Sequence, residues 1–387
     1  MIILSEAHKI KVFIFIDSYR IGGMHRQMFY LVDGIDKNKF EPIVCVSTDT
    51  GGLKERFMNT GCKLISLGWK GRYDLGMAFR LSKILKEEIP DIVFITEAQN
   101  LVYFRMAKLF WRKKVVQIGS FRALSFWLGN DKKNLHFIDN LFSNWLYKTS
   151  DYITTNSNAL KDHYTNIVSF KKNKPIQTIY NGSNFDFEIT KSKLEIRNEL
   201  NIPLEDIIII MVARLDPWKD FDTLLIAAKK VLKNYNNVKF ILVGDGALKD
   251  DLTQKIMKDD LNGKVILLGE KKDVFNYLSA ADISILSTNG EGFSNSILES
   301  MAFSKPVIAT EVGGNIELIG DTGEFGILVP SKSSDKLYNS IIRLLDNEKK
   351  RLEIGVSGKR RINELCNIDK YINSYEDIFI SSVQNKV

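Results

Sequence analysis

One stretch of the sequence has the order strand, loop, helix, strand: AADISILSTNGEGFSNSILESMAFSKPVIATEVGG, at Ala280–Gly314. Its apolar runs Ile283–Leu286 and Pro306–Ala309 are typical of buried strands, and the amphipathic segment Ser296–Phe303 lies between them. Continuous apolar strands that alternate with helices indicate a parallel sheet covered on both faces. This stretch therefore predicts an α/β fold.

The same alternation occurs twice along the chain. The first set of apolar runs comprises Lys11–Ile16, Pro42–Ser47, Asp91–Thr96, Val115–Ile118, Asp151–Asn156 and Gln177–Tyr180. The second set comprises Ile207–Val212, Lys239–Val243, Val265–Leu268, Ile283–Leu286, Pro306–Ala309 and Gly326–Val329. We therefore predict two doubly wound, Rossmann-like parallel-sheet domains.

A polar segment, residues 182–204, separates the two sets of strands. We place the domain boundary inside it, with a first domain at 1–185 and a second at 186–369. The amphipathic segment at 370–387 is expected to return to the first domain and complete it. Ligands of doubly wound sheets bind at the carboxyl ends of the strands, so we expect a binding cleft that the two domains face.

The composition is that of an ordinary soluble globular protein, with 44% apolar and 26% charged residues among 387. Three scattered cysteines are too few for a disulfide framework or a paired-cysteine metal site. No stretch approaches the roughly 20 apolar residues that span a bilayer, and the N-terminus does not have the pattern of a signal peptide. We expect a cytoplasmic protein, which can still bind the inner face of the cell membrane.

The net charge of +7 is distributed unevenly. Residues 1–180 carry 27 basic and 16 acidic side chains, or +11, and residues 181–387 carry 27 and 31, or −4. Basic and aromatic residues interleave at Tyr103–Lys114, and further aromatics follow at Phe126–Trp127, Phe137, Phe142, Trp145 and Tyr147. Three interpretations stay open for this region: an ordinary helix with buried aromatics, an anionic membrane surface, or single-stranded nucleic acid.

Two cations, Arg214 and Lys219, follow the strand Ile207–Val212. An arginine fork and a lysine point charge at this spacing suit a diphosphate, although exposed surface charges would give the same pattern. The next strand leads into VGDG at Val243–Gly246, which lacks the third glycine of a dinucleotide-binding fingerprint. This disfavours a nicotinamide enzyme and leaves Gly244 with the role of a tight turn.

The segment EGFSNSILE, Glu291–Glu299, joins a strand to a helix, with Ser294 or Asn295 as the expected N-cap. The unpaired N–H groups of that first helical turn predict a phosphate site. Glu299 would lie about one turn inside the helix, where a carboxylate can accept two ribose hydroxyls. Glu291 would lie where the sugar of a diphosphate sugar is expected. Ordinary loop and helix carboxylates are the alternative.

Taken together, these motifs resemble the nucleotide-sugar domain of the retaining glycosyltransferases of family 4, which have the two-domain GT-B fold. The signature of that family is two glutamates separated by seven residues, here Glu291 and Glu299. The wider match includes Arg214, Lys219, VGDG and the later GILVP at Gly326–Pro330. In the first half, GGMHRQMFYL at Gly22–Leu31 resembles the glycine loop of the family, and IYNGS at Ile179–Ser183 resembles its domain junction.

The resemblance implies a retaining, hexosyl-type transfer from a nucleotide-sugar, most often a UDP-sugar, to a glycan or a polyprenyl-diphosphate-linked acceptor in surface polysaccharide synthesis. Lipopolysaccharide is one such product. By the same resemblance, Arg214, Lys219 and Glu291 are catalytic, and the donor is held by Gly22, Gly23, Arg214, Lys219, Gly244, Phe293, Ser294, Asn295 and Glu299. Retention by a covalent carboxylate intermediate is possible in principle, but the family is usually described as using a front-face route. We find no acidic motif typical of a metal site and expect neither a metal nor a cofactor.

The sequence departs from the family pattern at two places. The glycine loop usually reads Gly-Gly-x-Glu-Arg, and here His25 replaces the glutamate while Arg26 is kept. Many members also carry a histidine after the fourth or fifth strand, where this chain has GSFRAL at Gly119–Leu124. Arg122 could occupy that space. We therefore regard His25, Arg26 and Arg122 as candidate acceptor or cleft residues.

Two other functions stay open: a sugar-nucleotide epimerase on the same scaffold, and a non-catalytic glycan-binding relative. The Glu291–Glu299 motif argues against the epimerase, and retention of Arg214, Lys219 and both glutamates argues against loss of catalysis. The resemblance also favours an anionic membrane surface over nucleic acid as the partner of the basic first half, so we expect no nucleic-acid partner.

Overall fold

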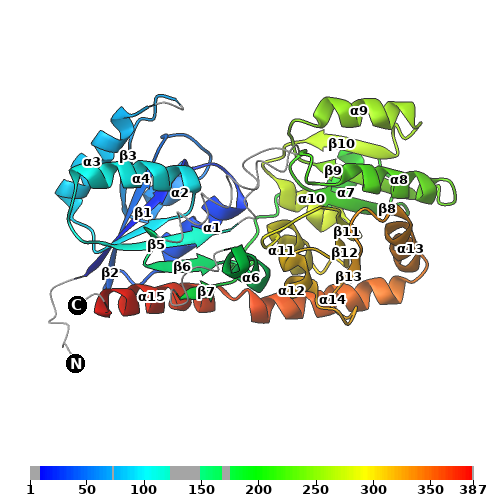
Figure 1. The fold of residues 1–387 in the computed structure, drawn as a ribbon. Coiled ribbons are helices and arrows are strands. Elements are labelled where there is room, and N and C mark those ends of the chain that lie inside the picture. The colour runs from blue at the N-terminus through cyan, green and yellow to red at the C-terminus, as the bar shows by residue number, and fades with distance from the viewer. Residues whose placement is uncertain (1–8, 72–73, 123–148, 168–174, 386–387) are drawn as a thin grey trace. The chain divides into compact units, whose positions relative to one another are not determined.

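A computed structural model describes residues 9–71, 74–122, 149–167 and 175–385. Contacts divide the chain into two compact units (Figure 1). Unit 1 comprises Met1–Ser183 and Cys366–Val387, and unit 2 comprises Asn184–Leu365. No helix within the described ranges is long and apolar enough to cross a membrane.

Unit 1 is built on a seven-stranded sheet in which all neighbouring strands are parallel. The strands are β1 (Ile10–Ile16), β2 (Phe40–Val46), β3 (Lys63–Ser66), β4 (Ile92–Ile95), β5 (Val116–Phe121), β6 (Tyr152–Thr155) and β7 (Ile176–Thr178). Their order is β3-β2-β1-β4-β5-β6-β7, so the direction of winding reverses between β1 and β4. Such a switch point is where doubly wound sheets bind ligands.

Helices cover both faces of this sheet (Figure 1). They are α1 (Gly23–Gly34), α2 (Lys54–Asn59), α3 (Gly76–Glu88), α4 (Ala98–Phe110), α6 (Asn158–Ile167) and α15 (Ile368–Gln384). Side chains of a strand alternate between faces, so Val12 and Ile14 of β1 pack with α1 and α15. Phe13 and Phe15 point the other way and pack with α3 and α4.

The last helix, α15, belongs to the core of unit 1 although it is distant in sequence (Figure 1, red). Its buried rings Tyr375 and Phe379 form edge contacts with Phe94 of β4. The Tyr371 hydroxyl donates a hydrogen bond of 2.9 Å to the Gln27 carbonyl of α1. Unit 1 is therefore assembled from two separate parts of the chain.

Unit 2 contains a six-stranded parallel sheet in the order β10-β9-β8-β11-β12-β13, which reverses between β8 and β11. Its strands are β8 (Ile207–Val212), β9 (Val238–Val243), β10 (Val265–Gly269), β11 (Ile283–Leu286), β12 (Val307–Thr310) and β13 (Ile327–Val329). Its helices are α7 (Lys193–Glu199), α8 (Phe221–Leu232), α9 (Lys249–Lys258), α10 (Val274–Ala280), α11 (Asn295–Ala302), α12 (Gly314–Ile319), α13 (Ser334–Leu345) and α14 (Glu348–Leu365).

The prediction of two doubly wound parallel sheets is confirmed. The sequence analysis missed one strand of the described chain, β3. It has four residues, KLIS, at the edge of its sheet, and both of its ends are exposed. Such a strand lacks the continuous apolar run by which we identified the others.

Candidate functional site

Two loops at the carboxyl edge of the unit 2 sheet are joined by hydrogen bonds. The loop after β8 (residues 213–220) and the loop after β11 (residues 287–294) meet because these strands are neighbours. The Asn289 amide donates to the Trp218 carbonyl at 2.8 Å, and the Ser287 hydroxyl donates to the Asp220 carbonyl at 2.9 Å. Together the two loops form a fixed polar surface at the switch point.

Lys219 and Glu291 form an ion pair across these two loops. The pair is mostly buried, since the side chains are 18% and 14% exposed. Charges in such a place interact more strongly than at an open surface, because less water screens them. The structure thus brings together two of the three residues predicted to be catalytic.

Two glycines, one after β9 and one after β12, allow the neighbouring loops to approach these two loops closely. Gly244 has a φ of 148°, and a Cβ atom there would lie 1.9 Å from the Ala213 carbonyl oxygen. Gly313 has a φ of 50°, and a Cβ atom there would lie 1.9 Å from the Glu291 carbonyl oxygen. Only glycine avoids both the strained φ and the collision, so these positions determine where the loop backbones lie.

The N-terminus of α11 lies directly after Glu291 in the chain. Ser294 is its N-cap, one of the two predicted residues, and accepts a hydrogen bond from the Ile297 amide at 3.3 Å. Phe293 and Ser294 are buried, and Glu299 is buried farther along the helix. The first N–H groups of a helix, together with its dipole, can bind a phosphate.

Arg214 has a carboxylate partner different from that of Lys219. Its side chain is 80% exposed and forms an ion pair of 2.7 Å with Asp216. The second oxygen of Asp216 accepts a hydrogen bond from the Trp218 amide at 3.1 Å. Asp216, which the sequence analysis did not single out, therefore orients the arginine and shapes the loop.

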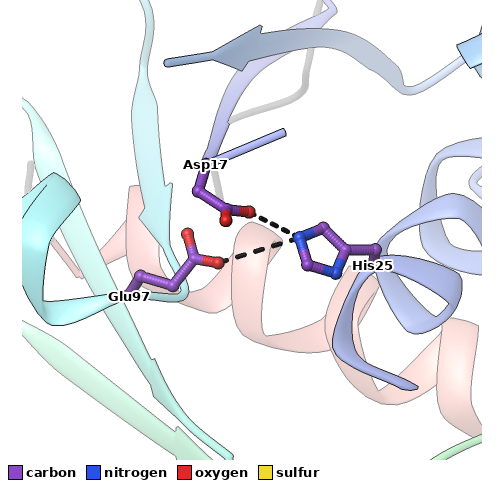
Figure 2. Close-up of side chains that lie close together, drawn as sticks. All are labelled: Asp17, His25 and Glu97. Carbon is purple, nitrogen blue, oxygen red and sulfur yellow. Dashed lines mark hydrogen bonds and ion pairs between the residues drawn. The ribbon is translucent and has the colours of Figure 1, made fainter. Parts of the chain in front are cut away.

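In unit 1, Gly22 is the N-cap of α1 and Gly23 is its first residue. His25 is buried on this helix, and Arg26 is half-buried beside it. Figure 2 shows His25 next to two carboxyl groups, with its Nε2 atom 2.5 Å from Asp17 Oδ1 and 3.9 Å from Glu97 Oε1. His25 is therefore held inside an acidic cluster.

Sequence reasoning missed Asp17 and Glu97. Asp17 follows directly on the buried strand β1. Glu97 follows the buried strand β4, with Thr96 between them. The same rule that selected Arg214, a polar residue just beyond a strand end, could have selected both. The strand order that makes β1 and β4 neighbours was the missing information.

The two carboxyl groups have opposite electrostatic character. Burial tends to raise the pKa of Asp17, but the hydrogen bond from His25 and the charges of His25 and Arg20 outweigh it and hold the pKa well below its usual range. Burial and the neighbouring charge of Asp17 raise the pKa of Glu97 well above its usual range. The surroundings thus favour the ionised form of Asp17 and the protonated form of Glu97.

Asp17, His25 and Glu97 each offer one possible ligand atom, and these three atoms lie within 4.8 Å of one another, a separation that a cation could bridge. However, the Arg20 guanidinium already forms an ion pair with Asp17. The raised pKa of Glu97 also disfavours the ionised carboxylate that a cation would need. We assign no metal to this cluster.

Arg122 is fully engaged in hydrogen bonds at the end of β5. Its guanidinium donates to Asn181 Oδ1 at 2.9 Å and to the hydroxyls of Tyr375 at 2.8 Å and Tyr371 at 3.3 Å. Its Nε atom donates to the Ser120 hydroxyl at 3.2 Å. These bonds connect β5 to α15 and to the segment after β7, so Arg122 has a clear structural role.

The basic and aromatic segment Tyr103–Lys114 is divided between core and surface. Tyr103, Phe104 and Trp111 are buried, whereas Leu109 and Phe110 are exposed. The three buried aromatic residues thus fit the interpretation of an ordinary helix with buried aromatics. Leu109 and Phe110 are exposed and accessible to a partner. The later aromatics Phe126–Trp127, Phe137, Phe142, Trp145 and Tyr147 lie outside the described residues.

Comparison with known proteins identifies the family. Residues 192–361 match the family model of the glycosyl transferases group 1, and residues 21–187 match that of glycosyltransferase family 4. The chain is 25% identical to N-acetyl-alpha-D-glucosaminyl L-malate synthase of Bacillus anthracis, over 79% of each chain. It is 30% identical to the Campylobacter jejuni N-acetylgalactosamine-N,N'-diacetylbacillosaminyl-diphospho-undecaprenol 4-alpha-N-acetylgalactosaminyltransferase, over 71% of this chain and 72% of that relative.

The fold is also that of known structures. Anabaena HepE, solved in complex with UDP and glucose, superposes with a TM-score of 0.81 at 20% identity, over 97% of this chain and all of the other. A sucrose-phosphate synthase from Thermosynechococcus elongatus superposes with a TM-score of 0.80 at 16% identity, over 96% of this chain and 99% of that one. The chain therefore belongs to the retaining glycosyltransferases of family 4, transfers a sugar from a nucleotide-sugar, and has the GT-B fold.

Proposed function

We propose that the protein transfers a hexosyl group from a UDP-sugar to a glycan acceptor linked to a polyprenyl diphosphate, in the synthesis of a surface polysaccharide. The observation that carries this proposal is the Lys219–Glu291 pair beside the N-terminus of α11. Two similar proteins support the proposed donor and the proposed acceptor. HepE was solved with UDP and glucose, and the Campylobacter jejuni relative acts on a diphospho-undecaprenol-linked sugar.

In this proposal the diphosphate lies between Lys219 and the first N–H groups of α11. Lys219 neutralises the charge that develops on the leaving diphosphate, an electrostatic role that needs no metal. Arg214, which is exposed, turns from Asp216 toward the phosphate when the donor binds. Glu299 binds the ribose, and Glu291 binds the hydroxyls of the transferred sugar.

Retention follows from a front-face route in this proposal. The acceptor hydroxyl attacks the anomeric carbon on the side from which the diphosphate leaves, and the departing phosphate oxygen takes the hydroxyl proton. The C–O bond to the diphosphate breaks as the new glycosidic bond forms. The ion pair with Lys219 holds the Glu291 carboxylate beside the sugar, which argues for a binding role rather than that of a free nucleophile.

The donor and the reaction can be tested together. We expect UDP to raise the melting temperature more than GDP or ADP, because a ligand of the native state stabilises it. Radiolabelled UDP-glucose, UDP-galactose, UDP-N-acetylglucosamine and UDP-N-acetylgalactosamine are then incubated with N-acetylglucosaminyl-diphospho-undecaprenol. We expect transfer from one of them, unchanged by a chelator.

Other outcomes would decide against parts of this proposal. Activity lost with a chelator and restored by a divalent cation would refute metal-independent catalysis. Conversion of the sugar-nucleotide to an epimer without transfer would support the epimerase alternative. Binding of UDP with neither transfer nor hydrolysis would support a non-catalytic relative.

We also propose that unit 1 contacts an anionic membrane surface, where a polyprenyl-linked acceptor would be anchored. An exposed apolar patch on α3 and α4 supports this: Leu75, Phe79, Leu109 and Phe110 are each more than half exposed. Phe79 and Phe110 touch, with ring centroids 6.1 Å apart. The exposed cations of residues 112–114 follow directly. Apolar side chains flanked by cations suit anionic headgroups.

We expect the protein to co-sediment with phosphatidylglycerol vesicles at low salt and to bind phosphatidylcholine vesicles at least tenfold more weakly. The double substitution Phe79→Ser and Phe110→Ser should weaken binding about tenfold, since it removes the apolar part of the contact. Met257→Ser, on the exposed surface of unit 2, is the matched control and should bind as the wild type does. Absence of binding at low salt would exclude the membrane surface.

A further inference from the structure

Unit 1 carries a charged cluster at the same topological position as the Lys219–Glu291 pair of unit 2. Asp17 follows β1, Glu97 lies just beyond β4, and these two strands flank the switch point of the sheet. In unit 2, Lys219 and Glu291 follow β8 and β11, which flank the corresponding switch point. Switch points of doubly wound sheets are ligand sites because the loops diverge there. The position of the cluster is therefore that of a second binding site.

The exposure of the three side chains divides their roles. His25 is 8% exposed, whereas Asp17 and Glu97 are 30% and 25% exposed. Figure 2 shows both carboxyl groups directed at the same ring nitrogen of His25. The histidine thus lies behind the carboxyl groups and holds them, and the carboxyl groups are the parts that a ligand can reach.

Buried polar groups hold Glu97 in place. The Asn100 side-chain amide donates to the Glu97 carboxyl at 2.8 Å, and the Ser47 hydroxyl donates to the Asn100 carbonyl oxygen at 3.0 Å. Asn100 is 1% exposed. A carboxyl group anchored from behind by a buried amide has a preorganised direction, as a binding group requires.

The charges of the cluster indicate what it would bind. The charged and titratable groups here are Asp17, Arg20, His25 and Glu97, while Asn100 is neutral. Arg20 balances the charge of Asp17, and burial together with the neighbouring charge of Asp17 raises the pKa of Glu97, which favours the protonated form of that carboxyl group. An ionised carboxylate accepts hydrogen bonds, and a protonated one both donates and accepts them. Neutral hydroxyl groups suit this combination better than a phosphate does.

We propose that Asp17 and Glu97 bind hydroxyl groups of the acceptor sugar, and that His25 is the positioning residue that holds the two carboxyl groups together. The inference rests on the proposed function, because it places the acceptor on unit 1. It adds two binding residues, Asp17 and Glu97, that lie outside the motifs on which the family resemblance rests.

The test uses the transfer assay to N-acetylglucosaminyl-diphospho-undecaprenol, with the acceptor KM as the measured quantity. We expect Asp17→Asn and Glu97→Ala each to raise that KM at least tenfold. Glu97→Gln should stay within about threefold of the wild type, because an amide resembles a protonated carboxyl in shape and hydrogen bonding. His25→Gln should retain more acceptor binding than His25→Ala, since the glutamine amide can still donate to a carboxylate. The donor KM should change less than twofold in all of them.

Glu87→Ala, which removes an exposed carboxylate of unit 1, is the matched control and should transfer as the wild type does. If the wild type transfers sugar and Glu97→Ala keeps its acceptor KM, this inference fails alone. If the wild type transfers no sugar to this acceptor from any of the four donors, the proposed function fails and takes the inference with it. Equal loss of donor and acceptor binding in every variant would indicate a merely structural cluster and also overturn it.

A second measurement tests the proton on Glu97 and excludes a metal. The pKa of Glu97 is raised in the folded state. The contribution of Glu97 to the free energy of unfolding is therefore fully present below about pH 4.5, and it is lost as the pH rises through the folded-state pKa. The wild type should therefore lose stability relative to Glu97→Gln as the pH rises from about 4.5. A constant difference across this range would overturn the proposal. So would a melting temperature that Mn²⁺ or Zn²⁺ raises in the wild type but not in Glu97→Gln.

Discussion

Lys219→Ala should slow sugar transfer by about 10²–10³-fold, because one lost charge-assisted contact to the leaving group costs about 2–4 kcal/mol of transition-state stabilisation. The position of Lys219 supports a large value. Its side chain is 18% exposed and pairs with Glu291, so little water can replace its charge. The measurement is kcat with a saturating donor, alongside thermal unfolding.

The control must separate catalysis from stability. Lys255→Ala removes another paired lysine of unit 2, which is 38% exposed and bonded to Asp222 and Asp251. An exposed pair of this kind contributes at most about 1 kcal/mol, so both transfer and folding should stay close to the wild type. A turnover of Lys219→Ala within threefold of the wild type would remove the diphosphate assignment.

Arg214→Ala should also slow transfer, but less than Lys219→Ala. By sequence alone the two cations are equivalent, and the family resemblance implies that both are catalytic. In the structure Arg214 is 80% exposed and paired with Asp216. Binding the diphosphate would require it to leave that partner, which reduces the net gain of the contact. If Arg214→Ala slows transfer as much as Lys219→Ala does, then moving Arg214 from Asp216 to the diphosphate costs little free energy, and the expected difference between the two variants is wrong.

Arg122→Ala should lower the free energy of unfolding by about 3 kcal/mol or more. Its guanidinium donates to Asn181, Tyr371 and Tyr375, and hydrogen bonds to a charged group contribute about 1.5–3 kcal/mol each without being additive. For a domain of this size the melting temperature falls by about 2–4 °C per kcal/mol, so a fall of about 6–12 °C is expected. Differential scanning calorimetry measures both quantities.

Arg112→Ala, an exposed arginine of the same unit, is the matched control and should stay within about 0.5 kcal/mol of the wild type. The free energy of unfolding of Arg122→Lys should lie between those of Arg122→Ala and the wild type, because lysine keeps the charge but not the planar fork. An unchanged melting temperature with a tenfold loss of transfer would instead favour the cleft role that the sequence analysis considered for Arg122.

The part of the site within unit 2 could be anticipated because its motif is local. Glu291, Ser294 and Glu299 lie within nine consecutive residues that join a strand to a helix, and the capping preference of serine identified the helix start. The tight turn expected at Gly244 agrees with its φ of 148°. These features depend on local backbone chemistry, which a sequence expresses directly.

The cluster of unit 1 could not be anticipated in the same way. His25 was identified as a departure from the family loop, but its partners come from the ends of two other strands. Strand order is set by how the whole set of helices and strands buries its apolar faces, and no single segment encodes it. Only when β1 and β4 lie side by side do Asp17 and Glu97 face one histidine.

By itself, the sequence determined two sets of buried strands alternating with helices and the chemical character of the loops at the strand ends. It did so because the period of apolar residues follows from backbone geometry. The tertiary structure decided which charges meet. It paired Lys219 with Glu291, directed Arg214 to Asp216, and enclosed Arg122 among side chains from the end of the chain. Such contacts depend on strand order and on the packing of separate segments, since charges interact strongly only at short distances and away from water.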